Sequence, residues 1–196
     1  MIVEVGIKLD YPLEYYQDIL KNAGAINTFN CETRDIYWSN KIFDGMTENE
    51  IKSSCVRYRM CRGFNSKKWD CVFQNYQLFN PTSDNSFKCE LRKLSQYELA
   101  FIEQHWQKVF DTYKKDYQYA IGDMKSRIQL QDIKDIGLLL YYDNPDYYHL
   151  PEDIQRKALI DELNSYGFNI SANTMGLDKL RTLWYGKEHF SWNQNE

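Results

Sequence analysis

The sequence lacks the features that mark several classes of protein. It nowhere contains the roughly 18 consecutive apolar residues that a membrane-spanning helix requires. The first residues, MIVEVGIKLDYP, do not include a basic region followed by a long apolar run, so we expect no targeting segment. The formal net charge is only -4 and the pI is about 5.5, so no general basic field would attract nucleic acid or an anionic membrane. We therefore expect a cytoplasmic protein that binds neither.

Neither the cysteines nor the histidines are spaced as metal ligands. The cysteines are odd in number and form no C-x-x-C pair, which argues against a zinc knuckle and against a secreted disulfide framework. The histidines His105, His149 and His189 lie far apart in sequence, without ligand spacing. We expect the thiols to be reduced and partly packed in the interior. The cysteines are Cys31, Cys55, Cys61, Cys71 and Cys89.

The chain is rich in the residues that build a folded core. Of its 196 residues, 43% are hydrophobic and 16% are aromatic, which excludes a disordered protein. This length favours one domain with a sizeable core. We predict a single domain over residues 1–196, in which residues 170–196 form a helical and aromatic C-terminal extension, present as a monomer or a homodimer.

Charged residues recur at every second position in several strand-like stretches. Side chains two apart in a strand project from the same face, so each stretch has one charged and one apolar face. An antiparallel sheet with one face in water alternates in the same way, and this interpretation stays open. Arginines at this spacing also suit bidentate contact with phosphate oxygens. The charged residues are Glu4 and Lys8, Arg57 and Arg59, Lys88, Glu90 and Arg92, and Lys125 and Arg127.

The apolar pattern predicts an α+β fold. Alternation predicts strands at residues 2–9, 26–38, 54–62, 68–78, 87–94, 125–130 and 138–142. Spacings of three and four predict helices at residues 13–23, 96–116, 152–166 and 177–184. We expect an antiparallel, roughly eight-stranded, barrel-like sheet with helices packed outside and a polar lumen.

Short motifs in a characteristic order give the chain a family resemblance. They are Glu4-Val5-Gly6-Ile7-Lys8, Asp35-Ile36-Tyr37, Arg57-Tyr58-Arg59, Lys125-Ser126-Arg127 and the segment 130–143, LQDIKDIGLLLYYD. In this order and spacing, the chain resembles the CYTH superfamily, the triphosphate tunnel proteins that include class IV adenylyl cyclases and thiamine triphosphatases. The resemblance covers residues 2–168.

The resemblance implies a basic tunnel that binds a triphosphate together with Mg or Mn. The metal prefers hard oxygen ligands, and its implied ligands are Glu4, Glu90, Asp143 and, as a weaker candidate, Asp132. The implied phosphate-binding residues are Lys8, Arg57, Arg59, Lys88, Arg92, Lys125 and Arg127. The chain departs from the family pattern mainly among the acidic residues, with Gly6, Gln131 and Tyr141 where the family has carboxylates.

Three functions remain open from the sequence. The first is a metal-dependent phosphohydrolase or cyclase that acts on an organic triphosphate or nucleotide. The second is a tunnel protein that binds phosphorylated ligands or polyphosphate without effective turnover, which the missing carboxylates favour. The third is a non-enzymatic interaction module whose charged strand faces are exposed to solvent. The sequence identifies no catalytic residue.

Overall fold

The computed structural model describes residues 5–69, 75–81, 87–93, 95–122, 126–171 and 179–185. Within these ranges, the side chains of residues 5, 48, 49, 53, 75–81, 87–93 and 126 are not described. The strands are β1 Val5–Lys8, β2 Ile26–Ser39, β3 Val56–Gly63, β4 Asn75–Pro81, β5 Phe87–Lys93, β6 Gln107–Ile121, β7 Ser126–Ile133 and β8 Gly137–Asp143. The helices are α1 Leu13–Asn22, α2 Glu48–Ser53, α3 Gln96–His105, α4 Glu152–Ser165, α5 Lys179–Tyr185 and the short 3-10 helix η1 Pro145–Tyr147.

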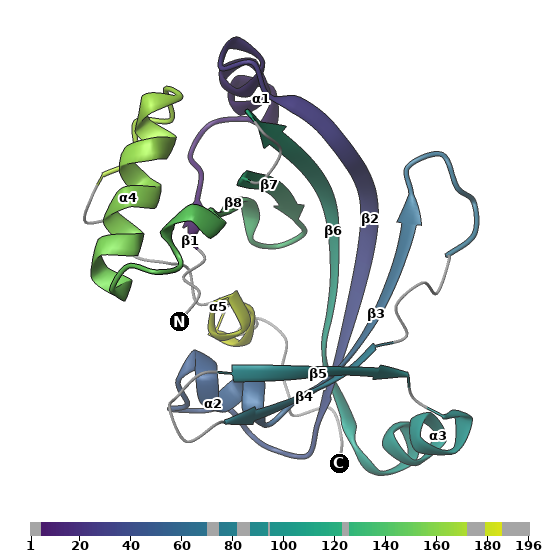
Figure 1. Ribbon diagram of the computed structural model, residues 1–196. Helices are drawn as coiled ribbons and strands as arrows, with labels where there is room; N and C mark the ends of the chain where they lie inside the picture. The colour runs from purple at the N-terminus through teal and green to yellow at the C-terminus, as the bar shows by residue number, and fades with distance from the viewer. Residues whose placement is uncertain are drawn as a thin grey trace. The chain divides into compact units, whose positions relative to one another are not determined.

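The strands are hydrogen-bonded in the order β1-β8-β7-β6-β2-β3-β4-β5 (Figure 1). The pairs β1–β8, β8–β7, β7–β6, β3–β4 and β4–β5 are antiparallel. The predicted α+β class and the antiparallel pairing are therefore confirmed. Closure of the sheet into a barrel is not confirmed, because β1 and β5 are the two ends of the strand order among the described residues. The closed barrel stays a prediction.

The chain divides into two compact units that share the long strands β2 and β6. Unit 1 comprises Met1–Glu32, Gly63–Ser66 and Lys114–Leu177. Unit 2 comprises Thr33–Arg62, Lys67–Tyr113 and Asp178–Glu196. The prediction of one domain over residues 1–196 remains a prediction. The short helix α5 lies within the predicted C-terminal extension and belongs to unit 2.

In unit 1, helices α1 and α4 pack on the apolar face of the sheet. Ile128 and Leu130 of β7 alternate with polar residues, and their side chains lie in one buried cluster with Leu140 of β8. Leu20 of α1 and Leu163 of α4 belong to the same cluster and are fully buried. Figure 1 shows α4 beside β1, and the two elements are in contact. The opposite face of these strands is mixed, with Arg127, Gln129 and Gln131 of β7 beside the buried Ile133 and Leu139.

In unit 2, aromatic residues hold the helices on the strands. Val56 of β3 and Ile102 of α3 form a small buried core, against which Trp38 and Trp106 pack. Trp184 of α5 contacts the rings of both Phe43 and Phe110, with centroid separations of 4.9 and 6.3 Å. Helix α5 is also in contact with α2. Among the helices of the described residues, none is long and apolar enough to cross a membrane.

The predicted helix over residues 96–116 is wrong in its second half. Helix α3 starts at a capping box of Ser95 and Glu98 but ends at His105, and Trp106 already has extended backbone angles. Strand β6 follows from Gln107. The buried positions of β6 include Thr112, Lys114 and Asp116, so the alternation is carried by polar residues and the apolar pattern could not show it.

The segment before β3, for which the sequence analysis predicts neither a helix nor a strand, contains a helix. Residues 48–53 form helix α2. Thr47 caps this helix by accepting a hydrogen bond from the backbone of Glu50, while the Glu50 carboxylate accepts one from the Thr47 backbone. This Thr-x-x-Glu pattern is a recognised helix-start signal, so the sequence did contain the evidence for α2.

Candidate anion-binding site

Strand β2 carries a buried polar face within unit 2. Alternate residues of β2 are buried, and in unit 2 these are Thr33, Asp35, Tyr37 and Ser39. The Asp35 side chain has no exposed surface. Burial of a carboxylate is costly unless cations and hydrogen bonds compensate it, so its neighbours define the chemistry of this face.

Arg59 of β3 pairs with Asp35 through two hydrogen bonds. The Arg59 Nε and Nη2 atoms donate to the two carboxylate oxygens of Asp35, at 2.6 and 2.7 Å. This fork geometry fixes the guanidinium plane, and it is the strongest arrangement available to an arginine and a carboxylate. The Asp35 backbone carbonyl also accepts a hydrogen bond from the Thr112 hydroxyl of β6, at 3.4 Å.

Lys179 of α5 is a second cation at this carboxylate. Its Nζ lies 3.9 Å from Asp35 Oδ2, and its side chain is only 13% exposed. The sequence analysis did not identify Lys179. The residue lies in the C-terminal extension, about 140 positions from Asp35, and no pattern in the sequence indicates that the extension returns to β2.

The electrostatic balance at Asp35 favours the ionised carboxylate. Burial alone would raise the pKa of Asp35, but the Arg59 guanidinium, assisted by Arg57 and Lys179, holds this pKa well below its usual range. Burial and the charge of Asp35 in turn raise the pKa of Tyr37, despite the opposing effect of Arg57 and Arg59. At neutral pH we therefore expect Asp35 to be charged and Tyr37 to be neutral.

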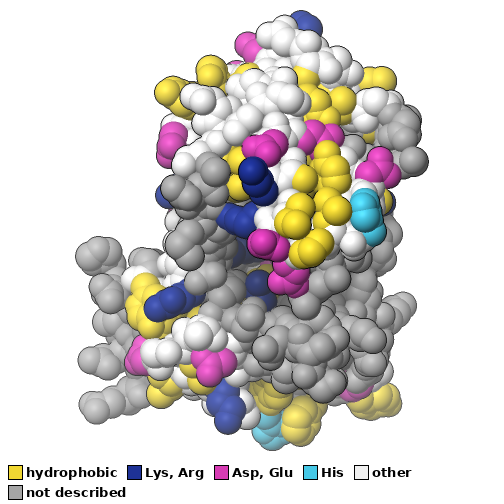
Figure 2. All heavy atoms as spheres, turned by 60° about the vertical axis from the view of Figure 1, so that its left-hand side comes forward, with side chains coloured by type: hydrophobic (Ala, Val, Ile, Leu, Met, Phe, Trp, Pro, Cys, Tyr) yellow, Lys and Arg dark blue, Asp and Glu magenta, His cyan; other side chains and the backbone are white. Residues whose placement is uncertain are grey.

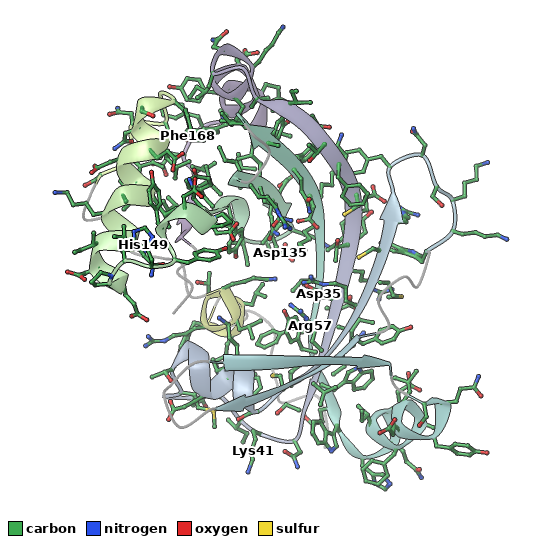
Figure 3. All side chains as sticks on the ribbon, in the orientation of Figure 1. Asp35, Lys41, Arg57, Asp135, His149 and Phe168 are labelled. Atoms are coloured by element: carbon green, nitrogen blue, oxygen red, sulfur yellow. The ribbon has the colours of Figure 1, made fainter. Side chains whose placement is uncertain are left out.

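Arg57 lies at this site without a direct hydrogen bond to the Asp35 carboxylate. Its side chain forms a hydrogen bond with Tyr37, and its charge acts on Asp35. The Nε atom of Arg57 is buried and has no hydrogen-bond partner among the described residues. Figure 3 labels Asp35 and Arg57, on the neighbouring strands β2 and β3.

Together these side chains form a cluster with excess positive charge, which we call the Asp35 cluster. It consists of Asp35, Arg57, Arg59 and Lys179, all within unit 2. Three cationic side chains act on this carboxylate, so the described side chains of the cluster carry a net charge of about +2 at neutral pH. On the face that Figure 2 shows, the coloured Lys and Arg side chains occur in small groups among acidic, hydrophobic and neutral ones. The cluster is thus a local site suited to an anion.

Unit 1 contains a second buried charged group, of a different composition. Lys114 and Asp116, two residues apart on β6, form an ion pair of 3.2 Å, and only 4% and 3% of their side-chain surfaces are exposed. Gln129 of β7 donates a hydrogen bond to Asp116 at 3.0 Å, and the Cys31 thiol lies 3.9 Å from the same carboxylate. Here one lysine and one aspartate balance each other.

The remaining predicted site residues in unit 1 are placed on β1, β7 and β8. Lys8 and Arg127 are exposed, and Arg127 is in register with Asp143 of β8. Tyr148 donates its hydroxyl hydrogen to the Asp143 carboxylate. Asp132 lies on the same face of β7 as the buried Leu130, opposite to the face that carries Arg127. The structure therefore brings Arg127 and Asp143 together, whereas Asp132 projects to the other side.

Several predicted residues cannot be placed. Glu4 and Lys125 lie outside the described residues. Lys88, Glu90 and Arg92 occupy alternate backbone positions of β5, but their side chains are outside the described part as well. Among the residues that the structure describes, no group of three or more His, Cys, Asp and Glu side chains is placed to hold a metal ion. The predicted ligand roles of Glu4, Glu90, Asp132 and Asp143 remain predictions.

Two of the positions that depart from the family pattern lie directly opposite each other. Gly6 of β1 is in register with Tyr141 of β8. A Cβ atom added to Gly6 would lie 3.0 Å from Tyr141 Cε1, closer than real Cβ contacts normally are. The tyrosine ring thus covers the glycine, in a place where the resemblance leads one to expect two carboxylates.

No family model and no curated protein matches the chain. Solved structures do match. A candidate adenylate cyclase from Vibrio parahaemolyticus has 12% identity and a TM-score of 0.57, with 92% of this chain and 96% of that chain covered. The PH1819 protein of Pyrococcus horikoshii OT3 has 13% identity and a TM-score of 0.55, with 86% and 92% covered. The PH1012 protein of the same organism has 13% identity and a TM-score of 0.54, with 90% and 100% covered. At such low identity, the similarity shows a shared fold.

Proposed function

We propose that the protein binds an organic triphosphate, or a similar polyphosphorylated small molecule, through the Asp35 cluster. The observation that carries this proposal is the gathering of three cations, since Arg57, Arg59 and Lys179 all act on the carboxylate of Asp35. A triphosphate carries about four negative charges near neutral pH, and its recognition depends mainly on positioned cations and hydrogen-bond donors. Arginine forks match phosphate oxygens especially well.

The proposal includes a closed sheet around a polar lumen. The similarity in fold to a candidate adenylate cyclase supports this arrangement, since that protein aligns over 96% of its length. We also propose phosphate-binding roles for the other basic residues that the resemblance implies, which are Lys8, Lys88, Arg92, Lys125 and Arg127.

Direct binding measurements test the proposed function. Isothermal titration calorimetry with tripolyphosphate, ATP and thiamine triphosphate should detect binding that weakens as the salt concentration rises. The substitution Arg57→Ala should weaken it, whereas Arg34→Ala should not, because Arg34 forms an exposed ion pair with Asp111. If the wild-type protein binds none of these anions, the charged strand faces serve another purpose and the interaction module is the better hypothesis.

A second candidate function is metal-dependent turnover of the bound triphosphate, by hydrolysis or cyclisation. The similarity in fold to a candidate adenylate cyclase favours it. It requires Mg or Mn, with Glu4 and Glu90 added to Asp143 as oxygen ligands. Release of phosphate or pyrophosphate from ATP, thiamine triphosphate and tripolyphosphate, with and without each metal, tests this candidate. Binding without release of either product would leave the protein as a binder of phosphorylated ligands.

A further inference from the structure

We infer that the two arginines of the Asp35 cluster have different tasks: Arg57 is the principal contact of the anion, and Arg59 is a positioning residue held by Asp35. This inference rests on the proposed function and refines it. The two residues are two positions apart on β3, so the sequence alone makes them equivalent. Their hydrogen bonds distinguish them.

The guanidinium of Arg59 is committed to the protein. Its Nε and Nη2 atoms both donate to Asp35, which has no exposed surface. An anion that took these two donors would leave a buried carboxylate without its main partner, at a high free-energy cost. Arg59 therefore cannot turn towards a ligand without disrupting the core of unit 2.

Arg57 has a buried donor that no described residue engages. Its Nε is buried and has no protein partner among the described residues, while the rest of the guanidinium is oriented by its hydrogen bond with Tyr37. A buried donor without an acceptor is unfavourable, and an oxygen atom of a bound phosphate would satisfy it. The charge-assisted bond formed in this way is stronger than a neutral one.

The fixed pair of Arg59 and Asp35 also orients Arg57. The Asp35 carboxylate attracts Arg57 by its charge, while both of its oxygens accept hydrogen bonds from Arg59 and the Arg57 side chain forms a hydrogen bond with Tyr37. Three cationic side chains, Arg57, Arg59 and Lys179, thus act on the single carboxylate of Asp35. A phosphate would meet Arg57 already in place, so little side-chain entropy would be lost on binding.

The test separates binding from stability in four variants. Tripolyphosphate affinity is measured by calorimetry, and Tm is measured without ligand, for Arg57→Gln, Arg57→Lys, Arg59→Lys and the control Arg34→Gln. We expect Arg57→Gln to lose about 10-fold or more in affinity, the equivalent of one charge-assisted hydrogen bond, with Tm lowered by no more than about 2 °C. Arg57→Lys keeps the charge without the Nε donor and should also lose affinity. This variant can replace Arg57→Gln in the test if Arg57→Gln does not fold.

Arg59→Lys should show the opposite pattern. It keeps the charge next to Asp35 but loses the fork, so Tm should fall by more than in Arg57→Gln, while affinity stays within about 3-fold of the wild type. The inference is overturned if Arg57→Lys and Arg57→Gln bind normally, or if Arg59→Lys loses as much affinity as they do. A wild-type protein that does not bind tripolyphosphate at all would instead overturn the proposed function, and this inference with it.

Discussion

The molecule has two buried groups of charged side chains, and the cost of burying a carboxylate is compensated differently in each. In unit 1, Lys114 and Asp116 neutralise each other on one strand, with Gln129 completing the hydrogen bonding. In unit 2, Asp35 has the fork of Arg59 and the further positive charge of Arg57 and Lys179. Both groups lie on polar faces of strands, but the described side chains of the first carry no net charge.

We interpret this difference in composition as the difference between a structural role and the proposed binding role. In a buried ion pair, each charge compensates the cost of burying the other. Three cations around one carboxylate repel each other, and a bound anion would reduce that repulsion. The contrast agrees with the proposed binding of a ligand in unit 2, and three experiments test it.

The largest effect should follow from removal of Arg59. In Arg59→Ala, Asp35 keeps only the more distant charges of Lys179 and Arg57, so the free energy of unfolding should fall by about 3–5 kcal/mol. Urea denaturation followed by circular dichroism measures this. The control Arg34→Ala breaks an exposed pair with Asp111 and should cost about 0.2–1 kcal/mol. Similar losses in the two variants would show that burial of Asp35 is unimportant.

Replacement of both partners should distinguish the two groups. Lys114→Met removes the lysine that is paired with the buried Asp116 and should be destabilising. The double variant Lys114→Met, Asp116→Leu should recover to within about 1 kcal/mol of the wild type, because apolar residues can often replace a buried ion pair. The double variant Arg59→Met, Asp35→Leu should recover less, since Arg57 and Lys179 would lose the attraction of Asp35. If urea denaturation gave both double variants the same recovery in the free energy of unfolding, the two buried groups would not differ in the way described.

The smallest effect concerns pH. The pKa of Asp35 is lower in the folded protein than its value of about 3.9 in unfolded chains, because Arg59, Arg57 and Lys179 outweigh the cost of burial. The ionised carboxylate therefore stabilises the fold fully above that unfolded value, and the stabilisation is lost as the pH falls below it. The difference in unfolding free energy between wild type and Asp35→Asn should narrow from pH 7 to about pH 3. A difference that stays constant would show that the charge of Asp35 is not what matters.

Much of the fold could be predicted from the sequence, because its local signals agree with its tertiary packing. Helices α1 and α4 each follow a proline and end before a glycine, and the structure confirms both. The long strand β2 was also predicted, although the polar residues Thr33, Asp35 and Ser39 occupy its buried face. Strand β6 was not, because Val109, Phe110 and Tyr113 continue the helical spacing of apolar residues from α3.

The candidate site could be predicted only in part. The spacing of Arg57 and Arg59 placed both on one face of a strand, but it could not show that Asp35 engages them differently. Lys179 was missed because its position depends on the packing of α5. In this helix, Trp184 donates a hydrogen bond to Asp44 at 2.9 Å. The Tyr185 hydroxyl accepts a hydrogen bond from the Gly45 backbone at 3.1 Å. Such contacts between distant residues leave no periodic signal in a single sequence.

The contact between Gly6 and Tyr141 constrains how this chain can change by mutation. The obstacle to a side chain at position 6 is the tyrosine ring, since Gly6 does not have the positive φ of the turn glycines. A carboxylate introduced at position 6 alone would require the ring to shift by a few tenths of an ångström, whereas a smaller residue at position 141 would make room for it. The effects of the two substitutions should therefore be non-additive. A change at position 6 should be better tolerated after a change at position 141 than before it.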